Sequence, residues 1–215
     1  MSFLASSKRL HGENFMETGK RSKTELKPTV FIDRDGTINE QMGYVNHPSR
    51  FVLLPGTKEA IRLLNNNGFY VVVVSNQSGV ARGYFPVSLL EEINDLMNRK
   101  LAEAGAHIDA IYYCPHYPTG IVKEYTMRCK CRKPGIGLIQ KARKDLEIDM
   151  SRSYVIGDTC SDLEMGQNAG IPSVLVRTGY GLGELEYVLP KKTVSPAYIA
   201  KDLLDAVHYI LSRSK

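Results

Sequence analysis

Apolar segments of two different lengths alternate along the chain after residue 27. The four consecutive valines at residues 71–74 are β-branched and uninterrupted, which is typical of a strand that is covered on both faces. Similar short runs predict strands at residues 30–33, 69–75, 108–113, 153–157 and 173–177. Longer segments with apolar residues spaced three or four apart predict helices at residues 57–67, 88–104, 136–146, 161–169 and 196–212.

The order of these segments indicates the fold class. Strands that are separated by helical segments form βαβ units, so we expect an α/β protein with a Rossmann-like, doubly wound parallel sheet. Ser88 and Glu91 have the spacing of a capping box at the start of the second predicted helix. In open sheets of this kind, ligands bind beyond the carboxyl ends of the strands. The residues that follow the predicted strands are therefore the candidates for functional chemistry.

Two aspartates follow the first predicted strand, in the sequence Asp33-Arg34-Asp35-Gly36-Thr37. Alternate residues of an extended segment point the same way, so the carboxylates of Asp33 and Asp35 should converge while Arg34 points elsewhere. Gly36 allows the backbone to turn sharply behind them. Paired acids at this place suit a cation site, a nucleophile with an acid/base partner, or both, although Asp and Gly are also ordinary turn residues.

Two later strand ends carry polar residues that should lie at the same edge of the sheet. The sequence Ser75-Asn76-Gln77-Ser78-Gly79 offers a hydroxyl, amides and turn N–H groups to an anion, although alone it is also typical of a polar turn. Asp158 can meet Asp33 and Asp35 across the sheet, and such a cluster needs a cation, for which oxygen ligands favour Mg²⁺. A helix N-cap is the structural alternative for Asp158 and Asp162, and we expect capping to be part of the role of Asp162.

Three cysteines and one histidine form two tight pairs, Cys114 with His116 and Cys129 with Cys131. Three thiolates and one imidazole suit a closed, tetrahedral, structural Zn²⁺ site. Directly behind the second pair, the sequence Arg132-Lys133-Pro134 precedes a predicted helix. A lysine near a carboxylate cluster can pair with a nucleophile and bind a phosphoryl group, whereas the alternative is a solvated loop. Zinc would then hold these basic residues at the site.

Composition restricts the class of protein. The chain has 215 residues, of which 43% are hydrophobic and 24% charged, as in an ordinary soluble globular protein. No apolar run approaches the roughly 20 residues that span a bilayer. The apolar start at residues 1–5 is too short for a secretory signal. We therefore expect a cytoplasmic protein with no membrane partner.

The net charge of +5 would suit a nucleic-acid partner, but its distribution argues against one. Residues 1–27 hold six basic and three acidic residues, so they account for three of the five net charges. The rest of the chain carries only +2 and few aromatic residues near its basic ones. We expect a polar, flexible extension at residues 1–27, one domain at residues 28–215 and no nucleic-acid partner. A zinc-stabilised nucleic-acid-binding module is the alternative from a different class.

Taken together, the motifs resemble those of the haloacid dehalogenase (HAD) superfamily of phosphatases. The order matches, with D-x-D-G-T, a Ser after an apolar strand, a Lys, and then G-D-x-x-x-D. Within the superfamily, the chain is similar to the group that contains heptose 1,7-bisphosphate phosphatases and histidinol-phosphatases. The stretches that carry this resemblance are D-R-D-G-T-I-N (33–39), G-Y-V (43–45), S-N-Q-S-G-V-A-R-G (75–83), Y-Y-C-P-H (112–116), C-K-C-R-K-P (129–134) and V-R-T-G (176–179).

The resemblance implies a HAD fold without a large cap domain, with a zinc-binding loop, in a Mg²⁺-dependent phosphatase of small phosphorylated sugars. We expect the protein to be a monomer. Asp33 would attack phosphorus to form an aspartyl-phosphate, and Asp35 would serve as acid and then as base. Mg²⁺ would bind the Asp33 carboxylate, the Asp35 main-chain oxygen and Asp158. Ser75 and Lys133 would hold the phosphoryl oxygens. The substrate-binding residues would include these two together with Gln41, Met42, Gly43, Tyr44, Asn76, Gln77, Ser78, Arg132 and Thr159.

Two positions differ from the pattern expected of heptose-bisphosphate enzymes. Gly135-Ile136-Gly137 follows Lys133-Pro134 where K-P-x-P-G is common, and Thr159 stands where relatives often have Lys. Neither difference affects Asp33 or Asp35, so phosphatase chemistry is still expected. The expected reaction removes the 7-phosphate of D-glycero-D-manno-heptose 1,7-bisphosphate in ADP-heptose biosynthesis, for lipopolysaccharide core or surface glycan. Hydrolysis of histidinol phosphate or another small phosphomonoester is the alternative.

Overall fold

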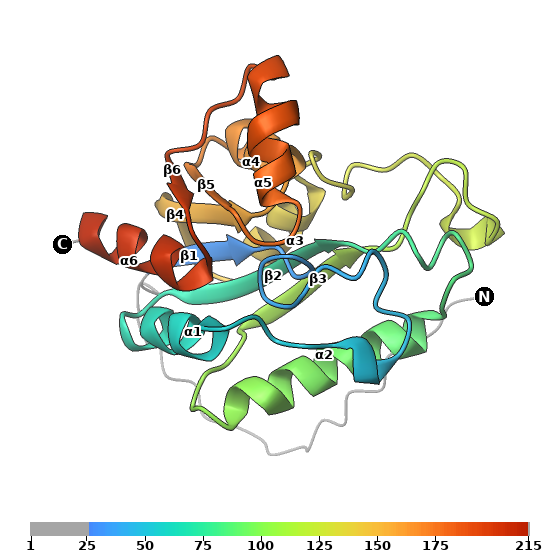
Figure 1. Cartoon of the computed structure of the whole chain (residues 1–215), viewed down its shortest axis with the longest axis horizontal. Coiled ribbons are helices and arrows are strands. Elements are labelled where there is room, and N and C mark those ends of the chain that lie inside the picture. Colours follow the sequence, from blue (N-terminus) through green and yellow to red (C-terminus); the bar gives the residue numbers. More distant parts are fainter. Residues whose placement is uncertain (1–25, 215) are drawn as a thin grey trace, which may run out of the picture.

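The computed structural model describes residues 26–214, which are built around a six-stranded sheet (Figure 1). All neighbouring strands are parallel, in the order β3-β2-β1-β4-β5-β6. This order confirms the predicted Rossmann-like, doubly wound sheet, and it places the ligand crevice where the order reverses, between β1 and β4. The strands are β1 (Lys27–Ile32), β2 (Tyr70–Asn76), β3 (Ala110–Cys114), β4 (Ile148–Gly157), β5 (Ser173–Val176) and β6 (Tyr198–Ala200).

The helices lie between the strands or follow the last one. Among the described residues, none of them combines the length and the apolar character needed to cross a bilayer. The α-helices are α1 (Thr57–Asn66), α2 (Val87–Ala102), α3 (Gly137–Asp145), α4 (Cys160–Ala169), α5 (Gly181–Gly183) and α6 (Leu203–Arg213). Short turns of other helix types are η1 (Pro48–Arg50), η2 (Lys123–Tyr125), η3 (Glu184–Val188) and η4 (Leu189–Lys191).

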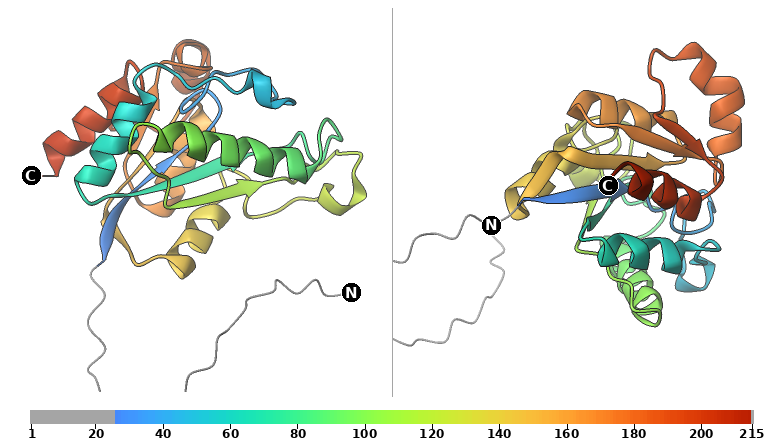
Figure 2. Two further views of the ribbon diagram at one scale, coloured as in Figure 1. Left: turned by 90° about the horizontal axis from the view of Figure 1, so that it is seen from below. Right: turned by 90° about the vertical axis from the view of Figure 1, so that its left-hand side faces the viewer.

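Helices cover both faces of the sheet, as the uninterrupted valine run predicts. Ile32 and Val73 face one side, where they pack in a cluster with buried residues of α1, α2 and α6. Phe31 and Val72 face the other side and pack with residues of α3 and α4. Figure 2 shows α1, α2 and α6 on one side of the strands and α3 on the other. Because both faces are apolar, the polar chemistry is confined to the strand ends.

Two of the predicted elements need correction. The helix predicted at residues 196–212 is wrong in its first part, because Tyr198–Ala200 forms β6 beside β5 and α6 begins only at Leu203. A three-residue strand is too short to show a period, and its partner comes from elsewhere in the chain. The predicted capping box at Ser88 does not form either, since α2 begins at Val87 after Pro86. The helical segment at residues 181–191 was not predicted at all.

The sheet begins near the start of the described residues. Residues 1–25 of the expected extension lie outside the described residues, and β1 begins at Lys27, the last residue of that extension. The loop between β1 and α1 contains only the short turn η1, so the described chain has no domain inserted there. This confirms the expected fold without a large cap.

Candidate active site

Most of the predicted site residues meet in one cleft at the carboxyl edge of the sheet, with a volume of about 320 Å³. Met42 does not line it, because its side chain packs against the core cluster that contains α1 and α2. Ser161 and Tyr180 also line the cleft without having been predicted to, as does Val45, which was named only within the G-Y-V stretch. The predicted residues in the lining are Asp33, Asp35, Gln41, Gly43, Tyr44, Ser75, Asn76, Gln77, Ser78, Arg132, Lys133, Asp158 and Thr159.

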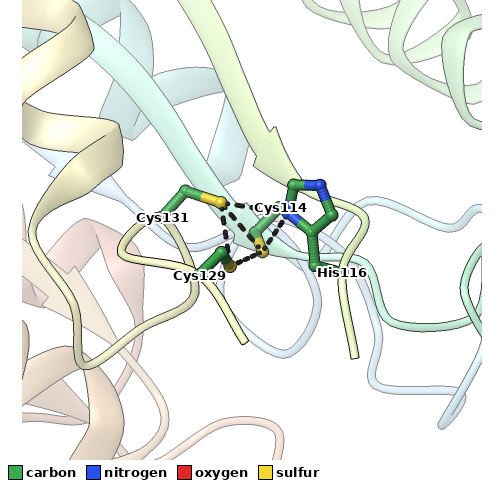
Figure 3. A group of neighbouring side chains, drawn as sticks. All are labelled: Cys114, His116, Cys129 and Cys131. Carbon is green, nitrogen blue, oxygen red and sulfur yellow. Dashed lines mark hydrogen bonds between the residues drawn. The ribbon is translucent and has the colours of Figure 1, made fainter. Parts of the chain in front are cut away.

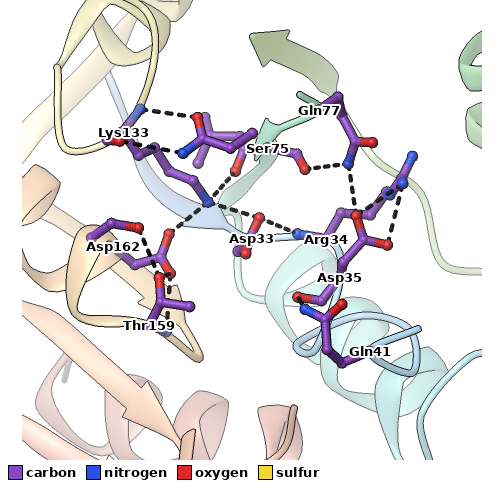
Figure 4. Close-up of polar contacts among 12 residues, drawn as sticks. Asp33, Arg34, Asp35, Gln41, Ser75, Gln77, Lys133, Thr159 and Asp162 are labelled. Carbon is purple, nitrogen blue, oxygen red and sulfur yellow. Dashed lines mark hydrogen bonds and ion pairs between the residues drawn. The ribbon is translucent and has the colours of Figure 1, made fainter. Parts of the chain in front are cut away.

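Lys133 joins two acidic side chains at the floor of the cleft (Figure 4). It is only 5% exposed, and its Nζ donates to Asp33 Oδ1 at 2.7 Å, to Asp162 Oδ1 at 2.6 Å and to the Val74 main-chain oxygen at 3.1 Å. Burial alone would lower the pKa of Lys133, but Asp162 and Asp33 together raise it above its ordinary value. The lysine is therefore a fixed positive charge with all three of its donors in use.

Asp33 lies at the end of β1 and is held by this lysine and by the main chain. Its Oδ1 also accepts a hydrogen bond from the backbone N–H of Arg34 at 2.8 Å. Burial raises the pKa of Asp33 to about 7, and repulsion from Asp162 and Asp35 adds to the rise while Lys133 opposes it. This carboxyl group needs further positive charge to be a stable anion near neutral pH.

Asp158 supplies the third carboxyl group of the cluster, and it has an unsatisfied oxygen. The side chain is 0% exposed and lies against Gly36 and Gly179, where an added Cβ would overlap it. Its Oδ2 accepts from the backbone N–H of Tyr180 at 2.8 Å, whereas its buried Oδ1 has no hydrogen-bond partner among the described residues. Burial, together with Asp33 and Asp162, raises the pKa of Asp158 to about 8.

The three carboxyl groups differ in what they can offer a cation. Oxygen atoms of Asp33, Asp158 and Asp162 lie within 4.8 Å of one another. Both oxygens of Asp162 are already used, because Oδ1 pairs with Lys133 and Oδ2 accepts from the backbone N–H and the hydroxyl of Thr159 at 3.2 and 2.6 Å. Asp33 and the free Oδ1 of Asp158 therefore fit a small divalent cation, while Asp162 holds the lysine and the start of α4.

Asp35 is surrounded by hydrogen-bond donors at the other side of the cleft. Its carboxylate accepts from Arg34 Nη2 at 2.9 and 3.2 Å, from Asn39 Nδ2 at 2.9 Å and from Gln77 Nε2 at 2.7 Å. Burial alone would raise the pKa of Asp35, but Arg34, Asn39 and Gln77 outweigh it and lower the pKa below its usual value. The expectation that Arg34 points elsewhere is wrong, because its long side chain folds back onto its neighbour.

The polar residues at the end of β2 position other groups as well as lining the cleft. The Asn76 side chain accepts from the Lys133 N–H at 3.0 Å and donates to the Lys133 carbonyl at 3.3 Å. Gln77 Nε2 also donates to Ser75 Oγ at 2.8 Å, so the Ser75 hydroxyl proton is left to donate elsewhere. Gln41 Nε2 approaches the Asp35 main-chain oxygen, the third expected Mg²⁺ ligand, at 3.5 Å.

Cys114, His116, Cys129 and Cys131 form a compact cage beside the cleft (Figure 3). Its sulfur atoms are 3.1–3.4 Å apart, and His116 Nδ1 lies 3.3 Å from Cys131 Sγ and 3.7 Å from Cys114 Sγ. A tetrahedral site with Zn–S bonds of about 2.3 Å separates its sulfurs by about 3.8 Å, so these four atoms form a slightly contracted version of that geometry. The four residues can hold a zinc ion, with His116 binding through Nδ1.

Known proteins with similar sequences and structures bear on this geometry. The model of the HAD-hydrolase-like family matches residues 130–206. A D-glycero-beta-D-manno-heptose-1,7-bisphosphate 7-phosphatase of Haemophilus ducreyi is 46% identical over 155 residues, which cover 71% of this chain and 85% of the relative. A D-glycero-D-manno-heptose-1,7-bisphosphate 7-phosphatase of Thermosynechococcus vestitus is 38% identical over 188 residues, or 86% and 95% of the two chains.

A solved structure extends the likeness to the whole fold. The crystal structure of D,D-heptose 1,7-bisphosphate phosphatase from B. bronchiseptica, complexed with magnesium and phosphate, is 33% identical and superposes with a TM-score of 0.76. The match covers 86% of this chain and 99% of the other. The sheet order, the acid and lysine cluster and these relatives all indicate the same family. The chain belongs to the D-glycero-D-manno-heptose-1,7-bisphosphate 7-phosphatase family of HAD-like hydrolases.

Proposed function

We propose that this protein hydrolyses the 7-phosphate of D-glycero-D-manno-heptose 1,7-bisphosphate, in the synthesis of ADP-heptose for lipopolysaccharide core or surface glycan. The observation that carries the chemistry is the buried carboxyl group of Asp33, paired with Lys133 at 2.7 Å beside the free oxygen of Asp158. The names of the relatives support the choice of substrate. A sugar phosphate fits a cleft of about 320 Å³ that is open to solvent and lined by polar groups.

In the first step of the proposed reaction, the free oxygen of Asp33 attacks phosphorus. Because its neighbours lower the pKa of Asp35, the step proceeds from the minor fraction of molecules in which this carboxyl group is protonated. The bond between phosphorus and the sugar oxygen breaks, and Asp35 gives its proton to that oxygen. The products are an aspartyl-phosphate at position 33 and the free sugar hydroxyl. The Ser75 hydroxyl donates to a phosphoryl oxygen during this transfer, because its proton is available, and the positive charge of Lys133 beside Asp33 attracts the phosphoryl oxygens.

In the second step, a water molecule attacks the phosphorus of the aspartyl-phosphate. The Asp35 carboxylate accepts the proton of this water, and the bond between phosphorus and the Asp33 oxygen breaks. Inorganic phosphate leaves, and both aspartates return to their initial states. Gln77 and Asn39 keep the Asp35 carboxylate at the cleft between the two steps.

Two metals are proposed as cofactors. Mg²⁺ would be held by the Asp33 carboxylate, the Asp35 main-chain oxygen and Asp158, and the free Oδ1 of Asp158 supports this assignment. When bound, Mg²⁺ would neutralise charge that develops on the phosphoryl oxygens. Zn²⁺ would be held by the Cys114, His116, Cys129 and Cys131 cage, where it would fix the chain that leads into Arg132 and Lys133.

We propose that the protein works in the cytoplasm as a monomer and has no nucleic-acid partner. The basic excess is concentrated in residues 1–27, which argues against an extended nucleic-acid surface on the catalytic domain.

The substrate assignment is tested by comparing kcat/KM for heptose 1,7-bisphosphate and histidinol phosphate, because specificity is the ratio of these values. We expect the heptose bisphosphate to be preferred, and a preference for histidinol phosphate would refute the assignment. Asp33→Asn should reduce kcat/KM by at least about 10³-fold, since it removes the nucleophile. Asp95→Asn, at an exposed position of α2, is the matched control and should leave activity unchanged.

A further inference from the structure

Arg34 is a buried cation whose place in the reaction is not explained by the proposed roles of the other residues. Its side chain is 1% exposed, and its only acidic partner among the described residues is Asp35. Both carboxylate oxygens of Asp35 accept hydrogen bonds from Arg34 Nη2. Taking a guanidinium group out of water is costly unless it is paired and hydrogen-bonded. A residue that served only to fill the core would be apolar, so the charge at Arg34 calls for a function.

Asn94 anchors the other end of this guanidinium group. Asn94 is 7% exposed on the face of α2 that buries Leu90, Ile93 and Met97, where a polar side chain is out of place. Its Oδ1 accepts a hydrogen bond from Arg34 Nη1 at 3.2 Å, and Asn94 makes no other side-chain hydrogen bond within residues 26–214. The asparagine therefore holds the arginine, and through it connects α2 to the catalytic edge of the sheet.

The three donors around Asp35 differ in how firmly they fix its carboxylate. Asn39 and Gln77 each supply one hydrogen bond to one oxygen. Arg34 alone contacts both oxygens, and its planar group is fixed at the far side by Asn94. A planar group that is held at both ends restricts rotation of the carboxylate more than a single amide does.

We propose that Arg34, anchored by Asn94, is a positioning residue that aims the Asp35 carboxyl group for proton transfer. It touches neither the substrate nor phosphorus and acts only through Asp35. This inference rests on the proposed function, in which Asp35 protonates the leaving oxygen and then deprotonates water. Arg34 and Asn94 are thus expected to affect those steps in which Asp35 moves a proton, and to leave the attack by Asp33 intact.

Leaving-group chemistry separates this role from a general structural one. A sugar alkoxide is a poor leaving group and needs the proton of Asp35, whereas p-nitrophenolate leaves without protonation. The value of kcat/KM covers the reaction up to departure of the leaving group, so it reports the acid step and not the later attack by water. A loss confined to the sugar phosphate therefore identifies a defect in proton donation.

The test measures kcat/KM for heptose bisphosphate and p-nitrophenyl phosphate in Arg34→Lys and Asn94→Leu. We expect a loss of about 10- to 100-fold on heptose bisphosphate, because small misplacements of a catalytic group cost up to about 10²-fold. The loss on p-nitrophenyl phosphate should be less than about threefold. Asn98→Leu, at an exposed position of the same helix, is the matched control and should change neither value.

A double variant decides whether the effect passes through Asp35. Asn94→Leu should cause no further loss on heptose bisphosphate when it is added to Asp35→Asn, because effects on one functional unit are not additive. Equal losses on both substrates, or a full additional loss in the double variant, would overturn the inference. If Arg34→Lys does not fold, the two Asn94→Leu comparisons decide the question. If Asp35→Asn itself spares heptose bisphosphate, the proposed function fails instead.

Discussion

Replacing Lys133 with methionine removes the positive charge at the centre of the site while keeping the length and apolar stem of the side chain. The structure shows what is lost: hydrogen bonds and ion pairs from Nζ to Asp33 at 2.7 Å and Asp162 at 2.6 Å, and a hydrogen bond to the Val74 carbonyl at 3.1 Å. Because the lysine is 5% exposed, water does not readily replace these contacts. Two buried carboxyl groups are left without their cation.

The expected cost follows from the burial of these groups. Removing one partner of a buried ion pair costs about 3–5 kcal/mol of unfolding free energy, since the remaining charge is unpaired. At roughly 2–4 °C per kcal/mol for a chain of this size, the melting temperature should fall by about 6–20 °C. The loss should be smaller near pH 5 than near pH 8, because Asp33, whose pKa is already raised to about 7, can take up a proton.

Urea unfolding of the metal-free and Mg²⁺-bound forms measures this loss, with zinc retained. Lys144→Met, at an exposed position of α3, is the matched control and should change stability by no more than about 0.5 kcal/mol. The kcat of Lys133→Met should fall by about 10²–10³-fold, because the positive charge that attracts the phosphoryl oxygens and holds Asp33 is lost. A stability loss below about 1 kcal/mol in the metal-free form would refute the claim that the lysine neutralises the cluster.

Metal binding provides two further predictions. Cys129→Ser should lower the zinc content from about one ion per chain and reduce stability, since structural zinc contributes folding energy; full stability in zinc-free protein would contradict the assignment. The dissociation constant of Mg²⁺, measured by calorimetry, should rise more than about tenfold when the pH is lowered from 8 to 6. The reason is that Asp33 and Asp158, whose pKa values are raised to about 7 and 8, must release protons to bind the ion. An affinity independent of pH would exclude these two ligands.

The sheet and the acids at its edge were predictable because they depend on short-range patterns. The valine run at 71–74 requires a strand covered on both faces, and the parallel order then brings the ends of β1 and β4 together. For that reason the meeting of Asp33 and Asp158 could be predicted without knowledge of their side-chain contacts. The cysteines and His116 were predictable as a cage because their residue types and spacing already match the needs of a metal.

The contacts that orient the site were not predictable, because they join residues that are distant in the chain. Asn94 lies 60 positions from Arg34 and reads in the sequence as one more polar residue of an amphipathic helix. Tyr180 holds Asp158 through its backbone N–H, which no side-chain pattern reveals, although the V-R-T-G stretch at 176–179 lies directly before it. The strand β6 was not predicted for the same reason, because it is a strand only through its pairing with β5.

The central claim is that Asp33 forms a covalent bond to phosphorus, and the Asp35→Asn variant tests it most directly. With p-nitrophenyl phosphate the first step needs no acid, whereas the second step needs Asp35 as base, so the aspartyl-phosphate should accumulate. Rapid mixing should give a burst of about one p-nitrophenolate per enzyme, the fingerprint of a covalent intermediate. Mass spectrometry of the acid-quenched protein should then place one phosphoryl group on Asp33. No burst, or a phosphoryl group on another residue, would contradict the account.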